Sequence, residues 1–150
     1  MTNNEALSKA MKLCSVKEYA VFEIHEKLLS WGVFQDECNT ILKHLQDEKF
    51  IDEFRMARFY ANDKLRFNKW GRVKIKFMLQ QKKVDKQAIS QALDTIEEEL
   101  YQNILSEELH KKNKSLKDTD PYIIKAKLYQ FATGRGFESE IIYRNLNKLV

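Results

Sequence analysis

The residues in this sequence that are best suited to chemistry are cations, and the chemistry they suit is the binding of a polyanion. Between Lys64 and Val84 the chain carries eight basic residues and no acidic one. Phe67, Trp70 and further apolar residues are interleaved with these cations, whereas a disordered basic tail would lack them. The pattern predicts two helices joined by a turn near residues 68–71, with the cations left on the outside. Such a surface suits the phosphate backbone of a nucleic acid.

Other residue types that often form active or metal sites lack the required spacing. The consecutive carboxylates at 97–99 point around a helix rather than converge, and the glycines of residues 134–136 lack the strand and the Lys-Ser/Thr of a phosphate loop. No Ser-His-Asp or Cys-His arrangement stands out. The spacing of the Cys and His residues of the first 50 positions fits no compact zinc motif: Cys14, His25, Cys38 and His44. We therefore expect neither an enzyme nor a metal or other cofactor.

The composition indicates one helical, globular chain. With 150 residues it can bury roughly 70% of its unfolded surface. Four glycines and one proline are too few for the turns of an all-β protein. The net charge of +4 is modest, but it is unevenly distributed. Residues 94–108 carry six acidic residues and no Lys or Arg, so the positive charge is concentrated in the basic run. Without an apolar leader or membrane span, we expect a soluble, cytoplasmic protein with two buried free thiols, Cys14 and Cys38.

An internal repeat predicts the architecture. Taking Val33, Val84 and Phe137 as anchors, which are 51 and 53 residues apart, apolar residues recur at the same offsets. The matching columns lie nine residues before the anchor and five, nine and twelve after it: Ile24, Ile75 and Leu128; Cys38, Ile89 and Ile142; Leu42, Leu93 and Leu146; Leu45, Ile96 and Leu149. Each repeat is expected to be a leading helix followed by a helix, a turn at the anchor and another helix.

The fold class predicted is therefore all-α, with three tandem three-helix repeats at about residues 4–50, 51–98 and 99–150. The leading helices are expected at about 4–13, 53–66 and 99–112, and a polar linker at 111–119. No repeat has room for a deep core of its own, so neighbouring repeats must bury faces against each other in an elongated, curved body.

Capping residues predict where the helices begin and end. Ser15 and Glu18 have the spacing of a capping box, which places a helix start near Val16. Gly32 and residues 134–136 are expected helix stops. The expected N-caps of later helices are Asp36, Asp85, Asp120 before Pro121, and Ser139.

The middle repeat carries a motif that resembles the RecX family of regulators of the RecA recombinase. The motif reads Ile51-Asp52-Glu53, Arg55-Met56-Ala57, Tyr60, Lys64, Gly71, Lys74-Ile75 and Leu79. Met56 replaces the family's usual Phe, and Arg72 stands where a Pro often follows the Gly. The resemblance extends over about residues 6–149, and it agrees with the three-repeat layout.

This resemblance implies a function without catalysis. RecX-like proteins bind the RecA–DNA filament, limit its extension and promote its disassembly, so that ATP hydrolysis, strand exchange and RecA-dependent repressor cleavage fall. The partners implied are the RecA filament and, as an auxiliary contact without sequence specificity, DNA. We expect a monomer without membrane contact.

Candidate contacts to DNA phosphates or to acidic residues of RecA are the cations of the middle repeat: Arg55, Arg58, Lys64, Arg66, Lys69, Arg72, Lys74 and Lys76. One of these residues has structural alternatives, because Arg55 could pair with Asp52 or hold the helix junction. Lys76 lies four residues beyond Arg72, so these two are expected to share an exposed face. Trp70 and Phe67 could stack on unpaired bases, but core positions are favoured.

Two further points stay open at the level of sequence. Either Val73 and Phe77 or Ile75 and Leu79 can face the core from the same helix. The alternative function is a helix-turn-helix DNA-binding protein or transcription regulator, since helix pairs recur three times. Against it, the cations lie along a helix and its leading turn, where they suit phosphates better than base edges.

Overall fold

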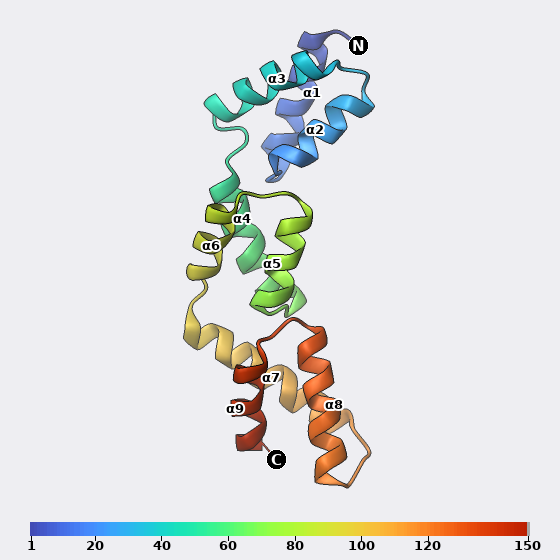
Figure 1. Cartoon of the computed structure of the whole chain (residues 1–150), viewed down its shortest axis with the longest axis vertical. Coiled ribbons are helices and arrows are strands. Elements are labelled where there is room, and N and C mark those ends of the chain that lie inside the picture. The colour runs from blue at the N-terminus through green and yellow to red at the C-terminus, as the bar shows by residue number, and fades with distance from the viewer. Residues whose placement is uncertain (150) are drawn as a thin grey trace. The chain divides into compact units, whose positions relative to one another are not determined.

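The computed structural model describes residues 1–149, and within that range it contains nine α-helices, one π-helical turn and no strand (Figure 1). The all-α prediction is confirmed. None of the helices described is long and apolar enough to cross a lipid bilayer. The elements are α1 (Asn3–Val16), α2 (Val21–Ser30), α3 (Gln35–Asp47), α4 (Glu53–Asp63), η1 (Lys64–Asn68), α5 (Arg72–Gln81), α6 (Lys86–Asp94), α7 (Glu98–Ser115), α8 (Pro121–Gly134) and α9 (Ser139–Leu149).

The chain divides into two compact units. Unit 1 contains Met1–Phe59 and Leu79–Ala92, and unit 2 contains Tyr60–Met78 and the chain from Leu93 onward. Helices α4, α5 and α6 therefore contribute residues to both units. The residues of the middle repeat are therefore divided between the two units.

The core of unit 1 forms where α1, α2 and α3 meet. Small side chains four residues apart on α1 allow the other helices to approach closely: Ala6, Ala10 and Cys14. They pack against Ile24 and Leu28 of α2 and against the apolar stripe of α3, Cys38, Ile41, Leu42 and Leu45. The stripes have the helical period that the sequence shows.

The core of unit 2 is built around Tyr101, which is fully buried, and α7 packs on both α8 and α9. The ring centroids of Tyr101 and Phe137 are 5.2 Å apart. Buried residues of η1, α5, α7, α8 and α9 complete this core: Leu65, Ile75, Leu105, Leu109, Leu128, Ile142 and Leu146. Ile75 is buried and Val73 is 56% exposed, so the structure selects Ile75 and Leu79 as the core-facing pair.

The three anchors end their helices in the same way. The backbone N–H of each anchor donates to the carbonyl five residues earlier: Val33 to Leu28 at 3.0 Å, Val84 to Leu79 at 3.2 Å, and Phe137 to Ala132 at 3.2 Å. The residue before each anchor has a positive φ, 84° at Gly32, 55° at Lys83 and 89° at Gly136. This is the Schellman stop, and it explains why the apolar columns recur at fixed offsets from these positions.

Several predicted helix boundaries were wrong. Helix α1 continues through Ser15, whose hydroxyl donates to the carbonyl of Lys12 at 2.7 Å, because its buried side chains extend to Cys14. The next helix begins at Val21, where the Glu23 carboxylate accepts a hydrogen bond from the Ala20 N–H at 2.8 Å. Two further predicted caps lie inside their helices, Asp36 in α3 and Ser139 in α9.

Other predicted boundaries were right. Asp85 accepts from the Gln87 N–H at 3.1 Å, and Asp120 accepts from the Tyr122 N–H at 2.9 Å. The predicted end of the third leading helix, at about residue 112, was wrong: α7 continues to Ser115, so the linker is shorter than expected. The leading helix of the middle repeat ends as an α-helix at Asp63 and continues as the π-helical turn η1.

Candidate functional site

The basic run begins with an irregular turn that exposes two of its side chains. The π-helical turn η1 is closed by the Trp70 N–H, which donates to the Lys64 carbonyl at 3.2 Å. Leu65 is buried beneath it, while Arg66 is exposed and Phe67 is 77% exposed. The expectation that Phe67 belongs to the core was wrong, because the extra residue in the turn changes the face on which its side chain lies.

Trp70 is covered by cations of the same run. The ammonium groups of Lys64 and Lys74 lie 5.4 and 4.7 Å from the centroid of its ring. Both lysines are half-buried, and Lys64 also lies 5.4 Å from the centroid of the Tyr60 ring. Cation–π contacts of this kind contribute about 0.5–1 kcal/mol at exposed sites. These two lysines therefore cover the Trp70 ring in addition to adding positive charge to the surface.

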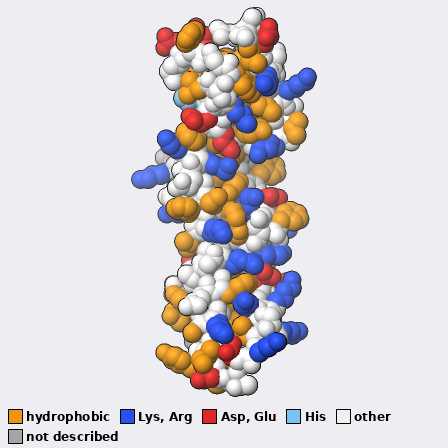
Figure 2. All heavy atoms as spheres, turned by 90° about the vertical axis from the view of Figure 1, so that its right-hand side faces the viewer, with side chains coloured by type: hydrophobic (Ala, Val, Ile, Leu, Met, Phe, Trp, Pro, Cys, Tyr) orange, Lys and Arg blue, Asp and Glu red, His pale blue; other side chains and the backbone are white. Residues whose placement is uncertain are grey.

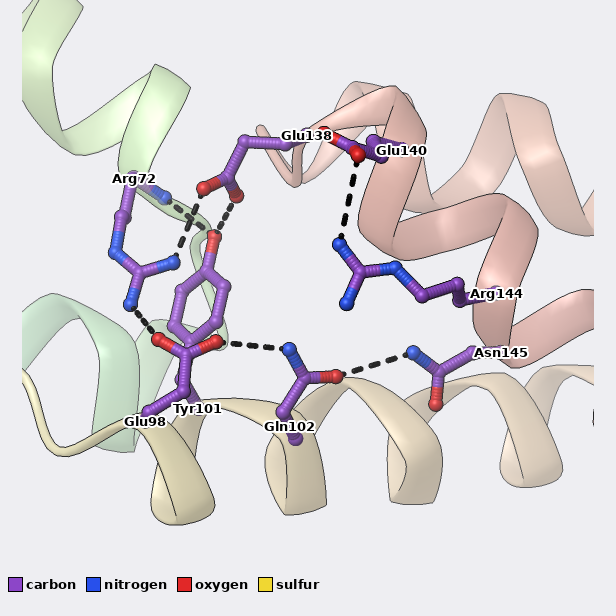
Figure 3. A network of polar contacts seen from close by, with 8 residues as sticks. All are labelled: Arg72, Glu98, Tyr101, Gln102, Glu138, Glu140, Arg144 and Asn145. Atoms are coloured by element: carbon purple, nitrogen blue, oxygen red, sulfur yellow. Dashed lines mark hydrogen bonds and ion pairs between the residues drawn. The ribbon is translucent and has the colours of Figure 1, made fainter.

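Arg72 is held in a network with acidic residues of α7 and of the turn before α9 (Figure 3). Its Nη2 lies 2.5 Å from Glu98 Oε2 and its Nη1 lies 3.0 Å from Glu138 Oε2. The guanidinium carbon lies 3.8 Å from the centroid of the Tyr101 ring. The phenol accepts from the Arg72 backbone N–H at 2.9 Å and donates to Glu138. The guanidinium therefore serves contacts within unit 2.

The network fixes the ionisation of its members near neutral pH. Hydrogen bonds from Gln102 and then from Arg72 lower the pKa of Glu98. Burial, followed by the hydrogen bond to Glu138, raises the pKa of Tyr101. The carboxylate is thus charged and the phenol neutral. Gln102 extends the network, because its Oε1 accepts from Asn145 Nδ2 of α9 at 3.3 Å (Figure 3).

The backbone at Gly71 lies against the backbone of the turn that follows α8. The Gly71 N–H donates to the Arg135 carbonyl at 2.8 Å, and the Val73 N–H donates to the Gly136 carbonyl at 2.9 Å. A Cβ atom on Gly71 would overlap the Gly136 carbonyl and come within 2.6 Å of Phe137 Cα. The position therefore requires glycine for the close approach of the two backbones. The N–H groups of Gly71 and Val73, at the start of α5, already have hydrogen-bond acceptors within the protein.

Helix α5 presents both charge and apolar surface to solvent. Lys76 is exposed, and Val73 and Phe77 are each 56% exposed. The exposed face predicted for Arg72 and Lys76 is thus half right: Lys76 lies on the surface, whereas the Arg72 side chain is only 21% exposed in its ion pairs. On the face drawn in Figure 2, Lys and Arg side chains lie among exposed apolar ones.

Arg55 and Arg58 belong to unit 1 and differ in environment. The Nε of Arg55 lies 2.6 Å from Glu18 Oε2, and its Nη2 donates to the Lys49 carbonyl at 3.0 Å. Arg55 thus holds the helix junction, which was one of the two structural alternatives. Asp52, the other proposed partner, instead accepts from the Arg55 backbone N–H at 3.1 Å and caps α4. Arg58 is exposed, with its guanidinium carbon 5.5 Å from the centroid of the Phe59 ring.

Much of the motif in the middle repeat is structural. Ile51, Met56 and Ala57 are buried. Glu53 joins two helix starts of unit 1, because its carboxylate accepts from the Val21 N–H at 2.9 Å and from the Asp85 N–H at 3.3 Å. Sequence reasoning missed the acidic partners Glu18, Glu98 and Glu138, since no spacing along the chain points to contacts 37, 26 and 66 residues away.

Once these contacts are assigned, the candidate site narrows to a smaller set of cations. Arg66 and Lys76 are exposed, and no ion pair to either occurs within residues 1–149. Lys69 is half-buried, and its ammonium donates to the Arg66 carbonyl at 2.6 Å. Arg66, Lys69 and Lys76 of unit 2 have neither an ion pair nor a cation–π contact within residues 1–149, and we call them the open cations.

Comparison with known proteins matches most of the chain to one family. The family model of the second three-helix domain of RecX matches residues 52–93, and that of the third three-helix domain matches residues 98–146. The regulatory protein RecX of Clostridium tetani is 30% identical over 130 residues, which are 85% of this chain and 59% of the relative. The regulatory protein RecX of Acinetobacter baylyi is 28% identical over 151 residues, 99% of this chain and 91% of the relative.

The coverage differs between these relatives, and a solved structure adds the fold. The chain spans 59, 57 and 60% of the length of three clostridial relatives. The crystal structure of RecX from Lactobacillus salivarius gives a TM-score of 0.89 at 20% sequence identity and covers 98% of this chain and 96% of that one. At this identity the likeness shows the fold alone, and it agrees with the all-helical repeat described above.

Proposed function

The chain belongs to the RecX family, and from this premise we propose that it modulates the RecA recombinase. In this proposal the protein binds the RecA–DNA filament, limits its extension, and lowers its ATP hydrolysis and strand exchange. The curated relatives are named regulatory proteins, which supports a role in binding rather than in catalysis. We also propose that it is a cytoplasmic protein and that it acts as a monomer.

The observation that carries the proposal is the set of open cations in a run without acidic residues. The DNA of a RecA–DNA filament carries a phosphate at every nucleotide, and exposed Arg and Lys side chains bind phosphates by direct Coulomb attraction. Arg66 offers a fork that can hold phosphate or carboxylate in two hydrogen bonds, and Lys76 offers a point charge. Arg58 of unit 1 adds a further exposed cation.

The remaining cations of the candidate site have a different role in this proposal. Arg72 and Arg55 form ion pairs with carboxylates of the same chain, so replacing them would weaken function by destabilising the folded protein. Lys64 and Lys74 cover Trp70 and contribute charge from half-buried positions. The proposed binding surface therefore depends on fewer cations than the sequence offers.

DNA contact is proposed to be independent of sequence. A recognition helix reads base edges with residues near its N-terminus, but the first turn of α5 lies against the turn after α8. The Arg72 N–H donates to Tyr101 and the Val73 N–H donates to Gly136. The open cations suit phosphates instead, which supports an auxiliary DNA contact over a transcription regulator.

The test is the rate of ATP hydrolysis by RecA on single-stranded DNA, measured with increasing amounts of this protein. The proposal expects the steady-state rate to fall in a saturable manner. It also expects the inhibition to weaken as salt rises, because each phosphate contact releases counterions. A rate that stays constant while the protein is in excess over RecA would contradict the proposed function.

A further inference from the structure

The most exposed aromatic side chain of the basic run is Phe67, and the local backbone places it on the surface. It lies in the π-helical turn η1, is 77% exposed, and follows the exposed Arg66. Leaving a phenyl group in water forgoes the roughly 1.5–3 kcal/mol that its burial would contribute. Single π-helical turns occur frequently at functional sites.

The same turn holds a second unusual conformation. Lys69, which ends η1, has a φ of 59° and lies in the left-handed region. That region costs a residue with a side chain about 1–2 kcal/mol. Lys49 and Lys83, the other non-glycine residues with positive φ within residues 1–149, end regular α-helices, whereas Lys69 ends the turn that carries Phe67. The conformation keeps the Lys69 ammonium next to the turn, where it donates to the Arg66 carbonyl.

The two aromatic residues of the run differ in what covers them. Trp70 is half-buried and has the ammonium groups of Lys64 and Lys74 at its ring. Among the residues that the structure describes, no cation or other ring stacks on Phe67. Phe67 thus offers a free aromatic face between cations, in a stretch from Lys64 to Val84 without a negative charge.

A ligand for this surface needs negative charges spaced along a chain and flat faces between them. Single-stranded nucleic acid has both, because its bases are unstacked and its phosphates repeat along the backbone. A duplex presents the phosphates but keeps its bases inside the stack. An acidic peptide presents the charges but lacks a flat ring at each repeat.

We propose that Phe67 stacks on an unpaired base of single-stranded nucleic acid while Arg66 and Lys69 contact the adjacent phosphates. This inference rests on the proposed function, since it assigns the DNA contact of that surface. It makes Phe67 the residue that distinguishes single strands from duplex. The open cations supply attraction to either form.

The test compares three forms of the full chain by fluorescence anisotropy: the wild type, Phe67→Ala, and Phe67→Trp. The probes are a labelled oligothymidylate, an abasic oligodeoxynucleotide of the same length and a duplex. Phe77→Ala is the matched control, because Phe77 is another exposed phenylalanine, 56% exposed, on the regular helix α5. Circular dichroism checks that all the variants are folded.

Phe67→Ala should weaken binding to the oligothymidylate by about 5- to 150-fold, the range for losing one stacked base. Its affinity for the abasic strand and the duplex should be unchanged, and so should the dependence of binding on salt, because no phosphate contact is lost. Phe67→Trp should bind the oligothymidylate with an affinity like that of the wild type, and Phe77→Ala should leave all three affinities as they are.

Equal losses on the oligothymidylate and the abasic strand would overturn the stacking role, and so would unchanged binding of Phe67→Ala or no binding by the wild type. These measurements contain no RecA, so they fail or succeed separately from the proposed function. If the wild type leaves RecA hydrolysis unchanged but Phe67→Ala gives the predicted pattern, the stacking inference stands and the RecA role does not.

Discussion

Removing the Arg72 side chain should destabilise the protein although Arg72 belongs to a basic surface run. The side chain is 21% exposed and pairs with Glu98, which is 61% exposed, and with Glu138, which is 31% exposed. The pair with Glu98 resembles a solvent-exposed ion pair, which contributes about 0–1 kcal/mol to stability. Loss of a partner from a buried pair costs about 3–5 kcal/mol, and the pair with Glu138 lies between these limits.

The guanidinium also lies on the Tyr101 ring, which adds about 0.5–2 kcal/mol. Arg72→Ala should therefore lower the free energy of unfolding by about 2–4 kcal/mol, as measured by urea denaturation followed by circular dichroism. Lys76→Ala on the same helix is the control and should change it by less than about 0.5 kcal/mol. If the two variants are equally stable, the network in Figure 3 does not stabilise unit 2.

Three further predictions follow from the same contacts. Gly71→Ala should lower the free energy of unfolding by several kcal/mol, since its Cβ would overlap backbone atoms. Gly134→Ala, in open space at the end of α8, should leave it unchanged or raise it by up to about 1 kcal/mol. Thermal denaturation measures both variants, and equal shifts in melting temperature would show that close approach at Gly71 is unimportant. Because the pKa of Glu98 is lowered in the folded state, its contribution is present above the usual carboxyl pKa of about 4.3 and is lost as pH falls through the lowered value. The wild type should thus lose more stability than Glu98→Gln between about pH 6 and pH 3, and parallel curves would contradict this. Burial, followed by the charge of Glu18, raises the pKa of Cys14 to about 11, so alkylation of Cys14 near pH 8 should be more than about tenfold slower in the native than in the urea-unfolded protein; equal rates would contradict this.

The repeat and its core could be predicted from the sequence because burial leaves a periodic signal. The residues of the columns at Ile24 and Cys38 are all buried, and the anchors share one backbone stop. The helix starts were predicted less well. Side chains that can cap a helix also occur inside helices, as Ser15 and Asp36 show, and tertiary burial decided where those helices begin.

The composition of the candidate site could be predicted only in part. A run of cations is visible in the sequence, but which of them pair within the protein depends on contacts between distant segments. Arg72 meets Glu138 across 66 residues, and no local pattern records that contact. The exposure of Phe67 depends on a π-helical turn, which the helical periodicity of the chain conceals. The structure therefore reduces the number of cations available to the proposed binding surface and places an exposed aromatic group, Phe67, among them.

The measurement that tests the central claim most directly is RecA ATP hydrolysis on single-stranded DNA in the presence of two charge-reversal variants. Arg66→Glu with Lys76→Glu reverses two open cations of unit 2. Lys12→Glu with Lys86→Glu makes the same change in net charge at two exposed lysines of unit 1. Circular dichroism and melting temperature confirm that both variants are folded.

We predict that the unit 2 variant loses most of its inhibition, at least about tenfold in the concentration needed for half inhibition, by repulsion as well as by lost attraction. The unit 1 variant should inhibit like the wild type. Equal inhibition by both variants, or equal loss in both, would contradict the claim that the open cations bind the filament.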